Sequence, residues 1–199
     1  MIAVASGANQ HLDAAYVSSL SDDVFPEGGV FLACGELRPD AVALALARAQ
    51  NRGMTTIFNP APVVSGWADP ELLRHVDILT PNEIETLQLA AILSTDASSL
   101  DAAVEVLLNH SVAQILVTRG PHGAILRGQV EASIPAPRVQ AVDTTAAGDA
   151  LNGALAVAIA EGLALDDAVR FAVHAASISV TRKGAQPSLP RRHELPPSL

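Results

Sequence analysis

The sequence predicts an α/β domain in which a mostly parallel sheet is covered by helices, in a Rossmann-like arrangement of three layers. Short apolar runs, of the length typical of buried strands, alternate along the chain with longer segments rich in Ala and Leu. That alternation is typical of parallel sheets, because two parallel strands need a long crossover between them, usually a helix. With 199 residues, 49% of them hydrophobic, the chain is expected to form one compact domain spanning residues 1–199.

The expected strands are short apolar runs that end at turn residues or at helical segments. They lie at residues 30–34, 55–58, 76–79, 114–118 and 139–142. Two further runs, 123–127 and 130–134, flank Gly128 and Gln129 and predict a hairpin. Cys34, in the first run, is expected to be a small buried hydrophobic residue rather than a catalytic thiol.

The first long helix is expected at residues 39–49, because Pro39 stands at its start and Gly53 beyond its end. Ala alternates there with larger apolar residues at a strand-like period, but Ala is the best helix former and the segment is long. The other expected helices span residues 82–92, 100–108, 146–161 and 165–181. The stretch 190–199, rich in Pro and Arg, is expected to be a loose tail.

Charge and composition exclude several classes of protein. The net charge of −9 argues against a nucleic-acid binder, because such a protein neutralises phosphates with clustered Lys and Arg. No apolar run reaches the length of a membrane span, and no basic segment precedes the short apolar run at 2–6, so neither a membrane partner nor a signal peptide is expected. The single cysteine cannot form an internal disulfide, and the histidines show no paired metal-ligand spacing. We expect a cytoplasmic protein.

An anion-binding helix start is expected after the strand at 139–142, which is followed by Asp-Thr-Thr-Ala-Ala-Gly-Asp at 143–149. Ligands of open α/β sheets bind beyond the carboxyl ends of the strands, and small residues at a helix start leave backbone N–H groups uncovered. Asp149, in the first turn, suits a base that takes a proton from a hydroxyl attacking the bound anion. The residues alone leave a structural alternative open, in which Asp143 or Thr144 merely caps the helix.

Residues 143–149, with the Leu-Asn-Gly-Ala that follows at 151–154, resemble the carboxy-terminal signature of the ribokinase family of carbohydrate kinases. Four further segments resemble successive segments of that family in the same order: Asn-Pro-Ala-Pro at 59–62, Thr-Pro-Asn-Glu at 80–83, Val-Thr-Arg-Gly-Pro-His-Gly at 117–123, and Val-Thr-Arg-Lys-Gly-Ala-Gln-Pro-Ser at 180–188. The resemblance covers nearly the whole chain. It implies a ribokinase-like fold and ATP-dependent phosphorylation of a sugar's primary hydroxyl, with D-ribose as the expected substrate.

The resemblance also implies roles for individual residues. Asp149 matches the catalytic base, preceded by the anion-hole residues Ala146, Ala147 and Gly148. Seven residues are expected to line the nucleotide. They are Thr118, Arg119, Gly120, Pro121, His122, Gly123 and Gly148. Asn82 and Glu85 match an Asn-x-x-Glu element that helps to organise Mg²⁺ and phosphate, and Glu36 matches an acid that contacts the sugar. A monovalent-cation site, expected to hold K⁺, is matched by Asp143, Thr145, Ser179, Arg182, Gly184 and Ser188.

Several of these residues have an equally simple structural interpretation. Asn82 and Glu85 have the spacing of a capping box at a helix start. The glycines of residues 118–123 are typical of a turn. Glu36 equally fits a solvent-exposed residue that follows a strand. The family often has an Asn or His that contacts the nucleobase of the nucleotide. In this sequence that position is Val173, beside His174, so the contact is left open.

The family's amino-terminal region is not matched here. It comprises a strand with a sugar-binding Asp, a lid of small strands and a Gly-Gly-Lys-Gly-Ala-Asn motif. We therefore expect this chain to be truncated at the amino terminus with the lid absent, to phosphorylate ribose poorly by itself, and to self-associate or form a homo-oligomer. The alternatives are a non-catalytic nucleotide-binding remnant and a part that needs a partner chain.

Overall fold

The computed structural model describes residues 7–94, 97–110 and 112–196. The chain divides into two compact units, Met1–Ala113 and Gln114–Leu199, which are described in turn. The expectation of a single domain over 1–199 stays a prediction. Between residues 190 and 196, where a loose tail is expected, the chain forms a turn of 3-10 helix, η6, at Arg192–Glu194.

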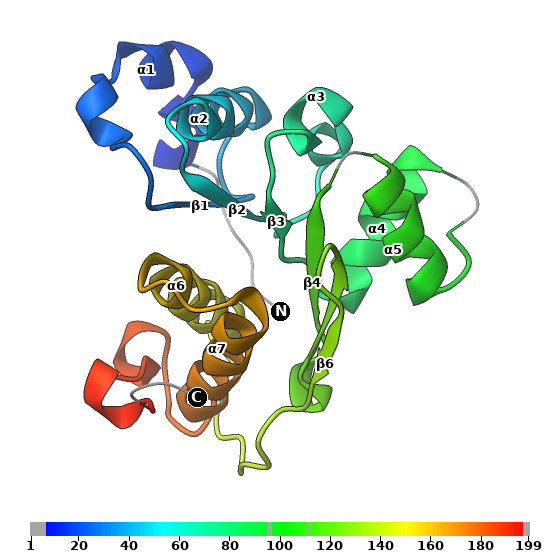
Figure 1. The fold of residues 1–199 in the computed structure, drawn as a ribbon, viewed down its shortest axis with the longest axis vertical. Coiled ribbons are helices and arrows are strands. Elements are labelled where there is room, and N and C mark those ends of the chain that lie inside the picture. The colour runs from blue at the N-terminus through cyan, green and yellow to red at the C-terminus, as the bar shows by residue number, and fades with distance from the viewer. Residues whose placement is uncertain (1–6, 95–96, 111, 197–199) are drawn as a thin grey trace. The chain divides into compact units, whose positions relative to one another are not determined.

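The first unit contains a parallel sheet of three strands in the order β1, β2, β3 (Figure 1). The strands are β1 Val30–Cys34, β2 Thr55–Asn59 and β3 Ile78–Leu79. Leu32 lies opposite Ile57 and Ile57 opposite Ile78, so the three strands run in one register. The predicted strands at 30–34 and 55–58 are confirmed.

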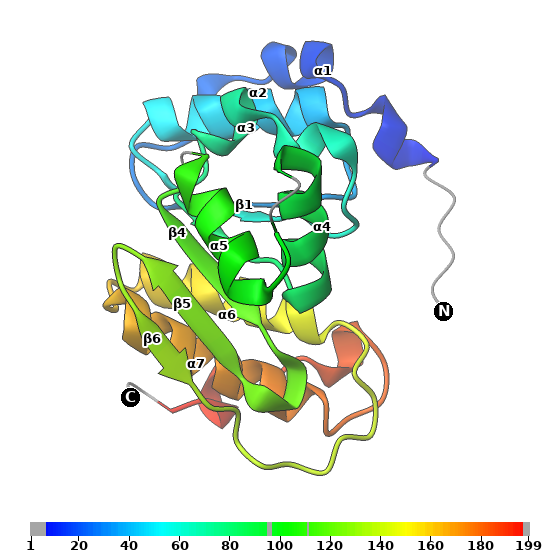
Figure 2. The ribbon, with the colours of Figure 1, turned by 90° about the vertical axis from the view of Figure 1, so that its right-hand side faces the viewer.

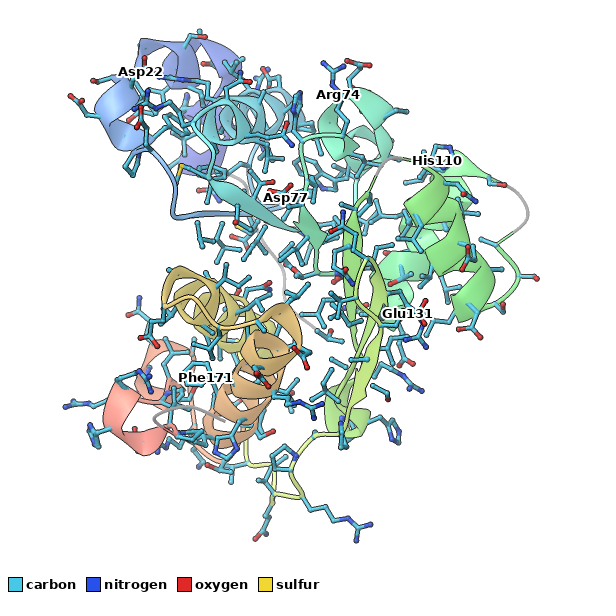
Figure 3. The ribbon with its side chains drawn as sticks, viewed as in Figure 1. Asp22, Arg74, Asp77, His110, Glu131 and Phe171 are labelled. Carbon is cyan, nitrogen blue, oxygen red and sulfur yellow. The ribbon has the colours of Figure 1, made fainter. Side chains whose placement is uncertain are left out.

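The third strand is shorter than the predicted 76–79 because Asp77 bonds with a side chain as well as with the ladder. Its backbone N–H donates to the hydroxyl of Thr56 at 2.9 Å, and its carboxylate accepts the backbone N–H of Thr56 at 2.8 Å. Asp77 is labelled in Figure 3. Thr56 is fully buried. The Thr56–Asp77 pair satisfies buried polar groups beside β2. It leaves only two residues of β3 for regular pairing with β2.

The helices of the first unit are α1 Ala14–Ser19, α2 Pro39–Asn51, α3 Pro70–Leu73, α4 Glu83–Leu93 and α5 Leu100–Asn109. In Figure 1, α2 lies beside β1 and β2. It buries Val42 and Leu46, which are four residues apart and so share one face. The strand-like alternation of its sequence is therefore overridden by helix propensity, as predicted.

A short amino-terminal segment, not predicted as a helix, is held on α2 by one arginine. The guanidinium of Arg48 donates to the carbonyl of Leu20 at 2.9 Å and to the carboxylate of Asp22 at 2.6 Å, and it lies 4.5 Å from the ring centroid of Phe25. Asp22 is labelled in Figure 3. The segment contains α1, whose N-terminus is capped by the Asp13 carboxylate. The contacts of the segment with Arg48 span 23 or more residues in sequence, which is why local patterns did not reveal them.

The second unit contains an antiparallel sheet, β4 Gln114–Thr118, β5 Ala124–Gly128 and β6 Ala132–Ile134, with the helices α6 Ala147–Ala160 and α7 Leu165–Ser179 (Figure 2). The predicted hairpin is thus confirmed as β5–β6. The buried amide of Gln114 closes its end, donating to the carbonyl of Val130 at 2.7 Å and accepting the N–H of the same residue at 2.9 Å. The two helices pack on one another, and α7 also contacts β5 and β6.

Among the described residues, the remaining regular structure consists of turns of 3-10 helix. They are η1 Ala8–His11, η2 Asp22–Val24, η3 Ser65–Ala68, η4 Gly120–His122, η5 Gln186–Ser188 and η6. No helix among the described residues is both long enough and apolar enough to cross a membrane.

Two expectations about apolar runs are wrong. Residues 139–142 do not form a strand: Val139 and Val142 are about half exposed, and the N–H of Val142 donates to the carbonyl of Val180 instead of to a neighbouring strand. Cys34 is exposed rather than buried. Side chains alternate along β1, so buried Ala33 points to one face while Leu32 and Cys34 point to the other, where both are exposed.

Candidate active site

In the first unit, the site residues follow the carboxyl ends of the parallel strands. Asn59 ends β2, and its side-chain amide donates to the carbonyl of Thr80, one residue after β3, at 2.6 Å. Thr80 in turn donates its N–H to the carbonyl of Phe58 at 2.9 Å. These bonds fix where the chain leaves β3, and therefore where α4 begins. Ligands of open α/β sheets bind at this edge.

Asn82 and Glu85 form a complete capping box at the start of α4. The Asn82 side chain accepts the N–H of Glu85 at 2.9 Å, and the Glu85 carboxylate accepts the N–H of Asn82 at 2.8 Å and its side-chain amide at 2.7 Å. The capping interpretation is therefore confirmed. The two residues supply oxygen ligands beside one another at the helix start.

The electrostatics of Glu85 fit a nearby divalent cation. Burial raises the pKa of the Glu85 carboxyl group, and the hydrogen bond from the Asn82 backbone offsets only part of that effect. A cation beside the carboxylate would compensate its half-buried charge. Within the described residues no three His, Cys, Asp or Glu side chains form a metal cluster. Mg²⁺ characteristically binds one or two protein carboxylates together with water and substrate phosphates, so this small donor set fits it.

Glu36 lies two residues beyond β1, and its side chain is exposed. Its carbonyl accepts a hydrogen bond from the Asn9 side chain at 3.3 Å. This environment matches the interpretation of Glu36 as a solvated residue after a strand, and the sugar contact implied by the resemblance stays a prediction.

In the second unit, the segment expected to line the nucleotide forms a tight turn between β4 and β5. Arg119 donates its N–H to the carbonyl of Gly123 at 2.8 Å, and Gly123 donates to the carbonyl of Gly120 at 3.1 Å. Gly123 has a φ of +86°, and a Cβ atom there would lie 2.0 Å from the carbonyl oxygen of Ile134. The backbone of this turn is thus packed directly against the end of β6, which only glycine allows.

The carboxylate of Asp143 joins two loops that are far apart in sequence. Its Oδ1 accepts the N–H of Thr145 at 2.9 Å and its Oδ2 accepts the N–H of Gly184 at 2.8 Å. The pKa of Asp143 is lowered to about 2, chiefly by the hydrogen bond with the Thr145 side chain and next by those from the two backbone N–H groups. The N–H groups of Val142 and Asp143 also donate to the carbonyl of Val180.

These contacts bring together the two halves of the predicted cation site. Ser179, Arg182, Gly184 and Ser188 follow or end α7, and the Asp143 carboxylate bonds with their segment. Ser179 and Ser188 are fully buried, and each donates its hydroxyl to a backbone carbonyl three residues earlier. The groups that could serve as cation ligands here are one carboxylate, hydroxyls and backbone carbonyls. A set made of oxygen alone fits a hard cation such as K⁺.

The start of α6 lacks a capping side chain. Ala146, at the N-cap, adopts the left-handed conformation with φ 61° and ψ 17°, and it makes no side-chain capping hydrogen bond. The interpretation of Asp143 or Thr144 as a side-chain cap is therefore wrong, because the Asp143 carboxylate turns to Thr145 and Gly184 instead. Gly148 and Asp149 are exposed in this first turn. Its N–H groups, together with the helix dipole, make a suitable place for an anion.

Sequence patterns missed the residues that hold this region from the carboxyl-terminal side. Arg182 forms an ion pair with Glu194, in η6. Nothing in the local sequence signals the pair, since the partners lie 12 residues apart with a loop between them. The position at which relatives often contact the nucleobase of the nucleotide is Val173, on α7. Val173 lies on the buried face of this helix and is 4% exposed, whereas the neighbouring His174 is half-buried.

The sequence and the fold of the chain are both similar to those of known proteins. Residues 3–192 match the model of the pfkB family of carbohydrate kinases. The chain belongs to this family. The match covers the strand edge with Asn82 and Glu85, the turn at Gly123, and the uncapped helix start with Asp149. The α/β fold predicted from the sequence is likewise confirmed, because ribokinases of known structure share it over nearly the whole chain.

Several individual members of the pfkB family are similar. A ribokinase from Haemophilus influenzae is 37% identical over 194 residues, which is 97% of this chain and 62% of that protein. The crystal structure of a ribokinase from Thermotoga maritima superposes with a TM-score of 0.87 at 34% identity, covering 98% of this chain and 63% of that one. A ribokinase from Arabidopsis thaliana, solved in complex with ribose and ATP, gives a TM-score of 0.76 at 30% identity over 97% of this chain and 62% of that one. The chain thus spans somewhat less than two thirds of the length of these relatives.

Proposed function

We propose that the protein catalyses the ATP-dependent phosphorylation of the primary hydroxyl of D-ribose, giving ribose 5-phosphate. The family match and the similarity to ribokinases, one of them solved with ribose and ATP, support this reaction. The observation that carries it in this chain is the start of α6, where an uncapped helix terminus stands directly beside an exposed acid, Asp149. A carboxylate there repels an anion bound beside it, and a role in proton transfer would explain its presence.

The task that we assign to Asp149 is that of the general base. Its carboxylate accepts the proton of the attacking sugar hydroxyl as the oxygen forms its bond to the γ-phosphorus of ATP and the bond from that phosphorus to ADP breaks. The backbone N–H groups of Ala146, Ala147 and Gly148 stabilise the negative charge that spreads over the transferred group. Left-handed Ala146 turns the chain into the helix. The N–H of Ala147 donates to the carbonyl of Thr144 at 3.3 Å in this structure, so for this role that group would have to turn to the anion.

The remaining residues of the site would bind and order the reactants. Residues 118–123, with Gly148, line the nucleotide, and Glu36 contacts the sugar. Asn82 and Glu85 would hold Mg²⁺, which when bound neutralises phosphate charge. Asp143, Thr145 and the 179–188 segment would hold K⁺, which acts by ordering the loop before α6. We further propose that the protein is cytoplasmic and that it binds no nucleic acid or membrane.

We also propose that the chain self-associates. Ile84, Leu87 and Ile92 lie on α4, and all three side chains are more than a third exposed. Apolar side chains grouped in this way favour association. Light scattering of the purified chain measures this directly, and a mass equal to one chain at micromolar concentration would contradict it.

The activity is tested by ribose-dependent release of ADP from ATP and Mg²⁺, with the product identified by mass spectrometry. The assay should be run on the longest form of the protein that its gene encodes and, separately, on the 199-residue chain, whose turnover we expect to be low. Other sugars of five and six carbons serve as controls for substrate choice. ATP binding without phosphorylation of any of these sugars would favour a non-catalytic nucleotide-binding protein.

A further inference from the structure

The carboxyl-terminal turn η6 is tied to three other parts of the second unit. The Glu194 carboxylate accepts from two N–H groups of the Arg182 guanidinium, one of them at 3.3 Å, and from the backbone N–H of Arg191 at 2.8 Å. The guanidinium of Arg192 contacts the carboxylate of Glu161, the C-cap residue of α6, at 3.0 Å. It also lies 5.2 Å from the ring centroid of Phe171 on α7, labelled in Figure 3.

Arg182 links this turn to the loop that holds Asp143. Two residues after Arg182, the N–H of Gly184 donates to one oxygen of Asp143, whose other oxygen accepts the N–H of Thr145. The next residue, Ala146, begins α6 in its left-handed conformation. A continuous series of contacts therefore runs from Glu194 to the helix start that carries Asp149.

The loop needs such an anchor because it has little regular structure of its own. No helix or strand covers residues 182–185, between the end of α7 and η5. Lys183 is exposed, whereas Arg182 and Glu194 are shielded, with side chains 36% and 28% exposed. Since the Glu194 carboxylate engages both its own turn and the loop, it fixes the position of one against the other.

We propose that Glu194 is a positioning residue of the candidate active site. By holding the Arg182 guanidinium it sets the backbone at Gly184, and through Asp143 it orients the start of α6. Glu194 acts through Arg182 and is assigned no contact with a reactant. Its effect on the loop is independent of the reaction catalysed, while its effect on turnover rests on the proposed function.

The effect on the loop is tested by amide hydrogen exchange of the 199-residue chain. Glu194→Gln removes the charge but keeps an oxygen that can cap η6. We expect exchange at Gly184 and Thr145 to quicken about twofold to fivefold, the range that a partly exposed ion pair can support. Arg182→Gln, which leaves the backbone carbonyl in place, should give the same increase, and the double variant no more than either.

A matched control is available in the first unit. Arg38 and Asp40 form an ion pair whose side chains are 44% and 43% exposed. Asp40→Asn removes a comparable pair and should leave exchange at Gly184 and Thr145 unchanged. Unchanged exchange in Glu194→Gln, or additive effects of the two single variants, would overturn the proposal.

The effect on turnover is tested by steady-state kinetics on the longest form of the protein that its gene encodes. We expect Glu194→Gln to lower kcat by about fivefold or more while the KM for sugar stays within about twofold, because a displaced helix start costs transition-state stabilisation rather than sugar binding. Faster exchange with unchanged kcat would overturn the catalytic part of the proposal. If the unmodified protein phosphorylates no sugar, the proposed function fails, and the exchange experiment alone decides whether Glu194 anchors the loop.

Discussion

The Asp143 carboxylate accepts the backbone N–H of Gly184, 41 residues later in the chain, at 2.8 Å. Its other oxygen accepts the N–H of Thr145. One side chain thus fixes the entry to α6 and the loop after α7 against each other. The geometry at the start of α6 therefore depends on a contact that is distant in sequence.

Replacing Asp143 by Asn should destabilise the chain in a pH-dependent way. The pKa of Asp143 in the folded state is about 2, against an ordinary value of 3.8. A depressed folded-state pKa means that the ionised group stabilises the fold fully above about pH 4 and that this contribution is lost as the pH falls toward 2. Urea unfolding of the wild type and Asp143→Asn between pH 2 and pH 6 checks this. A stability difference of equal size at both ends of the range would contradict it.

Replacing Asp149 by Asn should abolish most turnover in the active form of the protein. Loss of a general base lowers kcat by about 10²–10⁴-fold, whereas ATP affinity should change little. Asp166 lies in the first turn of α7 as Asp149 does in α6, so Asp166→Asn is a matched control that should keep its turnover. Kinase assays and nucleotide titrations measure both quantities, and near-normal turnover in Asp149→Asn would remove it from the role of base.

Replacing Ala146 by Gly should stabilise the chain, since its φ of 61° is strained for any residue with a Cβ. We expect the free energy of unfolding to rise by about 0.5–1 kcal/mol. The same change at Ala154, inside α6, should lower it by about 0.5–1 kcal/mol, because glycine weakens a helix interior. Opposite signs in denaturant unfolding would support the left-handed helix start, and equal signs would count against it.

The two glycines of the turn before β5 should differ in their tolerance of alanine. Both have positive φ, but a Cβ at Gly120 meets nothing within 4 Å, whereas one at Gly123 would collide with the backbone of Ile134. Gly123→Ala should therefore cost at least about 2 kcal/mol, and Gly120→Ala about 1 kcal/mol. Thermal unfolding of the two variants makes the comparison. Equal losses would mean that the turn is not packed against β6 as described.

Phosphoryl transfer should be faster in K⁺ than in Na⁺ or Li⁺ at equal ionic strength. The oxygen donors gathered around Asp143 and the 179–188 segment motivate this prediction. The cation would act by ordering the loop that precedes α6. Initial rates in the three chloride salts measure it, and equal rates would remove the cation from the proposed mechanism.

Much of the architecture was determined by local sequence alone. The strands β1, β2 and β4 were predicted because each is a short apolar run next to turn residues, and α2 because its length and alanine content override its alternating period. The ordered family motifs likewise indicated the segments around Asn82 and Asp149, since each motif is a contiguous stretch whose chemistry can be read from its own residues.

Only the tertiary structure decided the features that depend on distant partners. Residues 139–142 look like a strand, but Val142 donates its N–H to the carbonyl of Val180 instead, and Cys34 lies on the exposed face of an apolar strand. The junction of Asp143 with Gly184 and the ion pair of Arg182 with Glu194 join loops without any periodic pattern. Such contacts follow from where α6 begins and α7 ends in space, and a linear sequence encodes those positions only through the packing of the whole unit.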